Sequence, residues 1–598
     1  MADNNNLYSA LVGSIYLFNL LLGTGVLAMP AVFANAGYLS GIICLAILCL
    51  ISYVQTTFLI ETMANANFIK RMTKKSNAQQ TTELSPLLTN VNNADDDCYI
   101  SDDDGNDEMN DNDDYNDNGL IIINTNQSSA TNLLSIPNSE SDIRQLCSTT
   151  SINTITTTTT TNDNDNLQWN NIVCSDLIRN NNNRLQSIDH LDKRFNINEK
   201  FELGNMTELF LNQYLSKIFF ISVIVYLFGD IVIYNSMMSK SLRDISCTSK
   251  AYCDSSDSND PEHLNAICWD SITTITRKNA YQIFLLGFVA ILGPLTYAQL
   301  QKTKIIQILT IILRWLAFAS MIGITIKIFI SKQANGQPKA FNLLNLPKLF
   351  GICVYSFMCH HSVPSILTPI RNKKNLLMAV SIDYILVFAF YIIIAFTAVF
   401  AFDDINQVYT LNFQIDKCSH NNSNPASVPG FEIFLPTFPI FTLFSSYTIL
   451  ALTLINNMKV LVGFSNIIRY NCLIKYSMPL IAIIPPLLIA LFTEDVSSII
   501  QFVGSYSGTM IQYVFPTLLV YYSRKQVQQK FLLPYIKNRT KCEWIDERTI
   551  NMEKIYETLN SSVSYFRTNF WIYFTAIWWI ICICLVTLDH LRDAFHLY

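Results

Sequence analysis

Charged residues are scarce in this 598-residue sequence. Asp, Glu, Lys and Arg make up 14% of it, whereas 50% of the residues are hydrophobic and the mean hydropathy is +0.26. Soluble domains carry about 25% charged residues, so this composition indicates a polytopic membrane protein. The sequence also lacks a Walker loop, a nucleophile motif, a cluster of metal ligands and a basic patch. We therefore expect no enzyme, no cofactor or metal centre, and no binding of nucleic acid.

Long apolar runs set the expected number of membrane crossings. A helix needs roughly 20 mostly apolar residues to cross a bilayer core of about 30 Å. Eleven such runs occur, at residues 7–36, 38–66, 211–238, 279–300, 303–331, 345–370, 375–402, 431–457, 471–492, 496–522 and 565–590. The start, "MADNNN", has no basic segment and no cleavage site follows the first run, so we expect no signal peptide. The predicted fold class is an all-α polytopic membrane protein embedded in lipid.

Basic residues near the helix ends predict the orientation, because Lys and Arg are retained on the cytosolic side. They occur in four connecting loops: Lys70, Arg71, Lys74, Lys75, Lys302, Lys304, Arg371, Lys373, Lys374, Arg524 and Lys525. These loops share one side if the N-terminus is cytosolic. Eleven crossings then place the C-terminus, and the loops at about 239–278 and 403–430, in a lumen. A weaker basic cluster after the third span, diluted by two aspartates, argues the other way: Lys240, Arg243 and Lys250.

The connection between the second and third spans, residues 67–210, is expected to be a disordered cytosolic loop. It contains "DDDCYISDDDGNDEMNDNDDYNDN" and runs of Thr and Asn, which cannot bury enough apolar surface to form a core. Near its start stands "ELSPLL", with Glu83 four residues before the pair Leu87 and Leu88. Clathrin adaptors recognise this pattern, so we expect a lysosomal or endosomal membrane, with the plasma membrane as the alternative. A second cytosolic loop is expected at 523–564, before the last helix and a luminal tail within 565–598.

Four of the 15 cysteines lie in the two expected luminal loops: Cys247, Cys253, Cys268 and Cys418. Disulfides persist in such compartments, and four cysteines allow three pairings among which the sequence does not choose. Asn421, in "NNS", is an expected glycosylation site in the same region. Most of the other cysteines lie inside apolar runs, where they are expected to be small buried residues.

Two of the expected spans contain helix-breaking residues. The first, "YLFNLLLGTGVLAMPAVF", has Gly23-Thr24-Gly25 and then Pro30, and the sixth, "GICVYSFMCHHSVPSILTPI", has two prolines after a polar stretch. A proline kink in a Gly-rich packing face would explain the first span alone. The two spans, however, open successive groups of five, where inverted-repeat transporters place their discontinuous helices. Such a break offers free N–H groups to a carboxylate, and carbonyls to an ammonium or a cation.

The same residues resemble a known family. "LYSALVGSIYLFNLLLGTGVLAMPAVFANAGYLSG", "YSFMCHHSVPSILTPI" and "GSYSGTMIQYVFPTLLVYY" are similar to the first, sixth and tenth helices of the amino acid/auxin permease family. The resemblance implies a LeuT-type five-plus-five inverted repeat with an eleventh helix. Carried over by position, it implies a substrate site at Gly23, Thr24, Gly25, Phe357, Met358, Cys359, His360 and His361. His361 departs from the pattern, since relatives often have proline there.

Ionisable residues inside the expected spans are further candidates, because a charge in a membrane is costly. Asp230 is either a proton carrier or cation partner, or a structural carboxylate bonded to a hydroxyl or to Arg314. Arg314 itself is interpreted as an ion-pair partner, with snorkelling to an aqueous cavity as the alternative. Glu61 is expected at the interface. Hydroxyls of the eighth span offer a sodium site, unless they bond their own backbone: Thr442, Ser445 and Ser446.

Together these features predict secondary active transport of an amino acid by alternating access. Energy would come from a coupled proton or sodium ion, with the proton favoured by Asp230 and the histidines. A non-transporting amino-acid sensor of the lysosomal membrane is the alternative. The expected partners are membrane lipid, a small-molecule amino acid and a clathrin adaptor that binds Glu83–Leu88.

Overall fold

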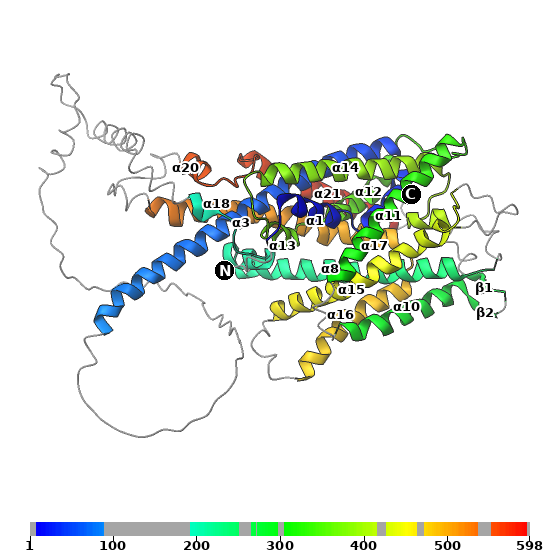
Figure 1. Ribbon diagram of the computed structural model, residues 1–598, viewed down its shortest axis with the longest axis horizontal. Helices are drawn as coiled ribbons and strands as arrows, with labels where there is room; N and C mark the ends of the chain where they lie inside the picture. Colours follow the sequence, from blue (N-terminus) through cyan, green and yellow to red (C-terminus); the bar gives the residue numbers. More distant parts are fainter. Residues whose placement is uncertain are drawn as a thin grey trace, which may run out of the picture. The chain divides into compact units, whose positions relative to one another are not determined.

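The computed structural model describes residues 7–88, 192–249, 265–270, 272–296, 304–414, 426–462, 472–535 and 552–594. The chain divides into two compact units, residues 1–75 with 177–598, and residues 76–176. The larger unit is a bundle of helices in which many long helices run side by side (Figure 1). Its one described sheet is an antiparallel hairpin of β1 (Ile267–Trp269) and β2 (Ile272–Thr276).

Seven helices among the described residues are long and apolar enough to cross a membrane. They are α3 (Tyr38–Leu88), α8 (Gln213–Ser246), α10 (Arg277–Leu295), α11 (Lys304–Ile330), α14 (Leu376–Ala401), α15 (Phe431–Val462) and α21 (Asn569–Ala594). The pair α1 (Ala10–Leu21) and α2 (Gly25–Ala36) makes an eighth if the two count as one bent span. The protein is therefore a multi-pass membrane protein.

The remaining predicted spans are helical but shorter or interrupted. The sixth is divided into α12 (Leu346–Ser356) and α13 (Val363–Leu367), and the ninth is α16 (Cys472–Phe492). The tenth changes its winding along its length, as α17 (Val496–Val503), the π-helical η5 (Gly504–Gly508) and η6 (Met510–Val514), α18 (Phe515–Gln526) and the π-helical η7 (Val527–Leu532). Shorter elements are η2 (Lys193–Phe195), α7 (Leu203–Phe210), η3 (Leu343–Asn345), η4 (Tyr409–Phe413) and α20 (Met552–Leu559).

The first predicted span is broken where the sequence places its glycines. Helices α1 and α2 meet at an angle of 51° around Leu22, Gly23 and Thr24. A Cβ atom at Gly25 would overlap the Ser356 Oγ atom and lie 2.9 Å from the Ser356 Cα atom. Glycine therefore lets the start of α2 lie directly against the end of α12, which brings the breaks of the first and sixth spans together.

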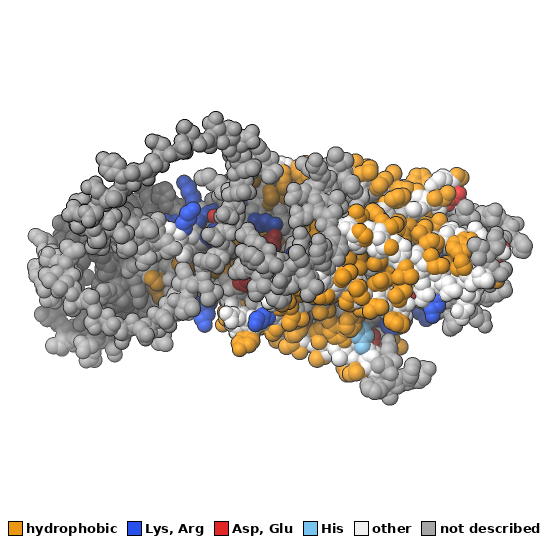
Figure 2. Space-filling view, turned by 90° about the horizontal axis from the view of Figure 1, so that it is seen from below, with side chains coloured by type: hydrophobic (Ala, Val, Ile, Leu, Met, Phe, Trp, Pro, Cys, Tyr) orange, Lys and Arg blue, Asp and Glu red, His pale blue; other side chains and the backbone are white. Residues whose placement is uncertain are grey.

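The surface of the bundle agrees with a lipid environment. On the face in Figure 2, hydrophobic side chains form a broad continuous area, and the visible charged side chains lie mainly toward its ends. Several helices expose large apolar side chains, for example Ile385, Leu488 and Ile577. Soluble monomers rarely expose apolar areas of this extent, whereas lipid-facing helices do.

The prediction of a disordered loop over residues 67–210 is wrong at both ends of that range. Helix α3 continues past residue 66 to Leu88, and residues 192–210 form η2 and α7. Arg71 explains this order, because its guanidinium donates to the carbonyls of Lys193, Arg194 and Asn196 at 2.7, 2.9 and 2.8 Å. The rings of Phe68 and Phe195 also stack, with centroids 4.3 Å apart. Composition alone does not reveal such contacts between the two ends of a loop.

Candidate functional site

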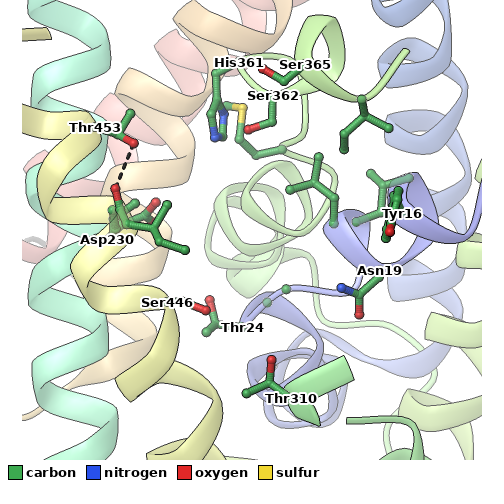
Figure 3. Close-up of a pocket in the computed structure, with 18 of the residues that line it drawn as sticks. Tyr16, Asn19, Thr24, Asp230, Thr310, His361, Ser362, Ser365, Ser446 and Thr453 are labelled. Carbon is green, nitrogen blue, oxygen red and sulfur yellow. Dashed lines mark hydrogen bonds between the residues drawn. The ribbon is translucent and has the colours of Figure 1, made fainter. Parts of the chain in front are cut away.

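A cavity of about 580 Å³ lies between the two broken spans and helices α8, α11 and α15. Figure 3 shows its polar side chains converging from these elements, with Thr24, Asp230, Ser446 and His361 around the open space. Nine of the predicted site residues line it: Gly23, Thr24, Gly25, Asp230, Arg314, Met358, His361, Ser445 and Ser446. The structure thus brings together residues that lie more than 400 positions apart.

Four other predicted residues do not line this cavity. Phe357, Cys359 and His360 are fully buried on the opposite side of the break, against α3 and α14. There the His360 Nε2 atom lies 3.2 Å from the Thr56 hydroxyl, and the Cys359 thiol lies 3.3 Å from the Tyr384 hydroxyl. The structure therefore places these three side chains away from the cavity in which the sequence prediction expected them, and in contact with α3 and α14.

The fourth, Thr442, bonds its own helix. Its hydroxyl donates to the carbonyls of Phe438 and Pro439 at 3.1 and 3.2 Å. The hydroxyls of Ser445 and Ser446 both donate to the carbonyl of Thr442 at 3.0 Å. Local bonding of this kind is common for hydroxyls in membrane helices. The alternative interpretation of the eighth span, that its hydroxyls bond their own backbone, therefore describes these three residues.

Asp230 is held at the cavity by a chain of hydrogen bonds. The carboxylate, in a residue that is 6% exposed, accepts at Oδ1 from the Tyr355 hydroxyl at 2.8 Å. The same hydroxyl lies 2.9 Å from the Thr24 hydroxyl at the break of the first span. Tyr355 therefore links the acid on α8 to the broken backbone of α1 and α2. The sequence prediction named both ends of this chain and missed its centre.

Arg314 does not fulfil its predicted role as an ion-pair partner among the described residues. Its Nη1 atom donates instead to the carbonyls of Asn19 and Leu22, at 2.9 and 3.2 Å, and to the Asn19 side-chain oxygen at 3.2 Å. These carbonyls belong to the last turn of α1, where helical partners are missing. Tyr391 completes this cap by donating to the carbonyls of Leu21 and Ser356 at 2.6 and 2.9 Å.

Several cavity residues were not identified from the sequence. They include Tyr226, Tyr234, Tyr355, Asn19, Thr310, Ser362, Ser365 and Thr453. A signal for two of them existed, because Tyr226 and Tyr234 lie four residues before and after Asp230 and so share its helical face. No comparable signal marks Tyr355, since its place depends on how α12 lies against α8.

Glu61, which the sequence analysis expected at the membrane interface, is fully buried within the protein. Its carboxylate accepts two bonds from the Arg524 guanidinium, at 2.7 and 2.8 Å, one from the Tyr556 hydroxyl at 2.8 Å and one from the Ser564 amide at 3.0 Å. We call these four residues the Glu61 cluster. Its members come from α3, α18, α20 and the segment before α21, so it joins parts of the chain that the sequence assigned to separate regions.

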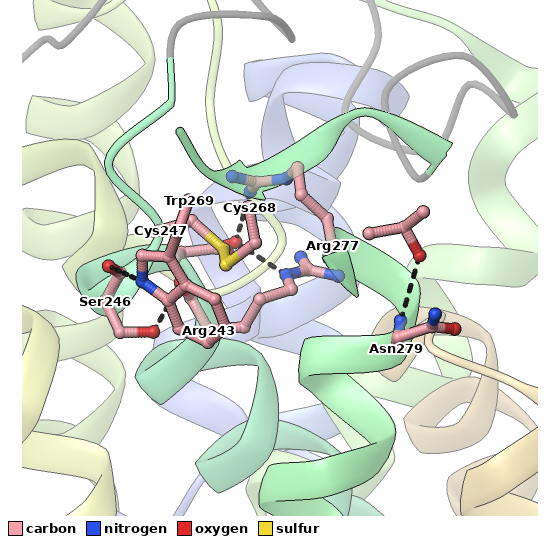
Figure 4. The surroundings of a disulfide bond; sticks show 9 residues. Arg243, Ser246, Cys247, Cys268, Trp269, Arg277 and Asn279 are labelled. Atoms are coloured by element: carbon pink, nitrogen blue, oxygen red, sulfur yellow. Dashed lines mark hydrogen bonds and ion pairs between the residues drawn. A yellow bond between two sulfur atoms is a disulfide. The ribbon is translucent and has the colours of Figure 1, made fainter. Parts of the chain in front are cut away.

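At the end of the bundle that carries β1 and β2, a disulfide joins Cys247 to Cys268 (Figure 4). Arg243 lies beside it, 1% exposed, and pairs with Asp244 at 2.8 Å and with Glu494 at 2.5 Å. The other predicted loop residues, Cys253, Cys418 and Asn421, lie outside the described residues. So do the side chains of the sorting motif Glu83, Leu87 and Leu88, whose backbone belongs to the last turns of α3.

The family model described as transmembrane amino acid transporter protein matches residues 202–540. This match defines the class of the chain as a member of the membrane amino-acid transporter family.

The relatives define its branch. The chain is 36% identical to the transmembrane protein 104 homolog of Drosophila melanogaster over 588 residues, 97% of each chain. It is 31% identical to transmembrane protein 104 of Homo sapiens, over 98% of this chain and 97% of that one. A homolog from Dictyostelium discoideum is 27% identical over 88% of this chain and 91% of its own length. Within its class, the chain belongs to the transmembrane protein 104 family.

Proposed function

We propose that the protein is a secondary active transporter of amino acids that works by alternating access. The observation that carries this proposal is the cavity of about 580 Å³ that both broken spans face, with an acid linked to one of the breaks. The arrangement supports a LeuT-type five-plus-five repeat with α21 as the eleventh helix. In such folds, substrate sites lie where discontinuous helices meet.

The N-terminus of α2 is the proposed binding site for the substrate carboxylate. The first turn of a helix has amide groups without helical partners and a positive dipole end, both of which favour an anion. Gly25 begins this helix and lines the cavity. Binding by backbone amides recognises the group that all α-amino acids share and requires no charged side chain.

The ammonium group of the substrate is proposed to lie toward Asp230. The sequence suggested carbonyls at the end of α1 for this role, but those of Asn19, Leu21 and Leu22 already accept from Arg314 and Tyr391. Asp230 is the one carboxylate among the described residues that line the cavity. A buried carboxylate next to an ammonium group gives the strongest available charge-assisted hydrogen bond.

A proton is the coupling ion that these contacts favour. Carbonyls exposed by a broken helix commonly coordinate a coupling cation, and here the fixed guanidinium of Arg314 lies at them. A second cation at the same carbonyls would be repelled by it. Asp230 is the proposed group that gains and loses the coupled proton, so its protonation state and its contact with the substrate ammonium are expected to depend on each other.

Uptake of radiolabelled amino acids into proteoliposomes tests the function. We expect an imposed pH gradient, and not a sodium gradient, to drive uptake. Asp230→Asn should abolish pH-driven accumulation, because it removes the proposed proton carrier, and should also weaken exchange of internal for external amino acid, because the substrate ammonium loses its carboxylate partner. The control is Asp403→Asn, which changes an exposed acid after α14 and should behave as wild type. Saturable binding without any uptake would contradict transport and support a sensor.

The proposed location is a lysosomal or endosomal membrane, with a cytosolic N-terminus and a luminal C-terminus. The basic cluster that argued against this orientation is largely internal: Arg243 is paired with acids, and Lys240 is 4% exposed and donates to Gln407 at 3.0 Å. Buried and paired basic residues say little about the side of a loop, because the rule concerns charges presented to the membrane surface.

A double variant tests whether the Glu83–Leu88 motif directs the protein to lysosomes. Leu87→Ala with Leu88→Ala should move the protein from lysosomes to the cell surface, measured as surface biotinylation of the full chain. Leu133→Ala with Leu134→Ala, which changes a leucine pair without an acidic residue four positions earlier, is the matched control and should leave the distribution unchanged. An unaltered distribution of the first variant would refute the proposed adaptor motif.

A further inference from the structure

A second, smaller cavity of about 210 Å³ lies between α1, the end of α13 and the start of α14. It shares no lining residue with the larger cavity. Its polar groups are the Ser14 hydroxyl, the side chains of Asn372 and Asn375, the Lys374 side chain and the Asp383 carboxylate. None of these residues has a role in the proposed transport site.

Asp383 gives this cavity its chemistry. The residue is 4% exposed, and its Oδ2 atom has no hydrogen-bonding partner among the described residues. The Ser14 hydroxyl lies within hydrogen-bonding reach of the same carboxylate. A buried, ionised carboxylate oxygen without a partner is unfavourable by several kcal/mol, so a proton, a water or a bound cation in the cavity would stabilise it. The cavity is large enough for one, because a single water requires only about 10–15 Å³.

The set of donors suits a monovalent cation. The Asp383 carboxylate and the Ser14 hydroxyl are hard oxygen donors and together carry a single negative charge. Asn372 and Asn375 are exposed lining residues, and the Asn372 Oδ1 atom already accepts from the Lys374 amide at 3.1 Å. Calcium sites usually collect several carboxylates. The ammonium group of Lys374 would further disfavour a divalent ion at the same cavity. We propose that Asp383, with Ser14, forms a binding site for an alkali-metal cation.

This site is connected to the larger cavity through α1. Ser14 and Gly13 face the small cavity, whereas Tyr16, Asn19 and Leu20 of the same helix line the large one. The start of α1 is also bound to the segment after α13: the Tyr8 amide donates to the Pro369 carbonyl at 3.2 Å, and the Arg371 amide donates to the Tyr8 carbonyl at 3.0 Å. A cation that bridges Ser14 and Asp383 therefore holds α1 against α14, on the side of the large cavity where Tyr8 lies.

Thermal unfolding of the purified full chain in detergent tests the site without any transport measurement. Midpoints are compared in sodium, potassium and choline chloride at equal ionic strength. We expect sodium or potassium to raise the midpoint by several degrees over choline, saturably with concentration, because a ligand that binds only the folded state stabilises it. Asp383→Asn should abolish this difference, whereas Asp230→Asn should retain it.

The proposal is overturned if the wild type unfolds at the same temperature in all three salts, or if Asp383→Asn retains the ion-specific shift. Should Asp383→Asn not fold, Ser14→Ala replaces it. We expect that variant to raise the half-saturating cation concentration several-fold, and an unchanged concentration would contradict the site. Retention of the shift in Asp230→Asn makes the result independent of the proposed transport function, so that either can fail alone.

Discussion

At the scale of single residues, the decisive feature is how closely the backbones of the two broken spans approach. The sequence identified the glycines of the first span correctly as the position of the break. It did not reveal that the two have different roles. Gly25 is packed against Ser356, whereas a Cβ atom at Gly23 would meet only the Leu20 carbonyl oxygen, at 3.8 Å.

This difference gives a prediction for two conservative substitutions. Gly25→Ala should lower the free energy of unfolding by about 1–3 kcal/mol and abolish amino-acid binding, because the added methyl group has no space beside Ser356. Gly23→Ala should fold and bind as wild type, since its methyl group enters ordinary van der Waals distance. Thermal unfolding in detergent with ligand binding measures both effects. Equal behaviour of the two variants would refute the role assigned to the close approach.

The acid and the arginine show what residue type alone can and cannot predict. A charge inside an apolar run is a sound indication of a special site, and Asp230 and Arg314 both line the cavity. Their partners could not be predicted, because a carboxylate accepts equally well from a hydroxyl or a guanidinium. Only the positions of Tyr355 and of the last turn of α1 decide between those possibilities.

At the scale of helices, the sixth span illustrates a limit of motif transfer. The resemblance carried over a run of five consecutive residues as one binding segment. Consecutive residues in a turn point in different directions, so Met358 and His361 face the cavity while Phe357, Cys359 and His360 are buried on the other side. The segment does lie at the cavity, but the sequence could not predict which of its residues face it, because that depends on the surrounding helices.

The Glu61 cluster gives a prediction at this scale. Arg524→Ala should destabilise the protein by about 3–5 kcal/mol, because it leaves the fully buried Glu61 carboxylate without its cation. Arg567→Ala is the matched control: its pair with Glu557 has side chains 49% and 26% exposed, so its loss should cost less than about 1 kcal/mol. Denaturation of both variants in detergent provides the comparison. A similar loss in both would mean that the cluster is no more important than a surface pair.

At the scale of the whole molecule, the hydropathy of the sequence predicted the helical membrane protein well. Apolar length is set by the thickness of the bilayer, so each long run identified in the sequence corresponds to a helical region. Within the described part of the chain, however, length and composition alone qualify seven helices, or eight with the bent pair. The interrupted spans do not meet this length criterion, because their helices end inside the apolar run.

The proposed orientation predicts that the two ends of the chain lie on opposite sides of the membrane. A fluorescent tag at the N-terminus should be degraded when protease is added to cells with a permeabilised plasma membrane, and a tag at the C-terminus should be protected. An even number of crossings would expose or protect both tags together and would refute the eleven-helix arrangement. A tag on the cytosolic tail of a lysosomal membrane protein of known topology controls for permeabilisation.

The hydrogen bonds that Arg314 and Tyr391 donate to the end of α1 have a consequence for the free energy of ligand binding. Because these two side chains satisfy the carbonyls at the end of α1, the unwound backbone is ordered before any ligand arrives. Binding then does not have to remove the conformational freedom of a loose loop, which is a large unfavourable contribution when a site forms around its ligand. In the proposed transporter, the site is formed before the solute enters, and we expect discrimination between amino acids to come from the side chains of α8 and α15 across the cavity.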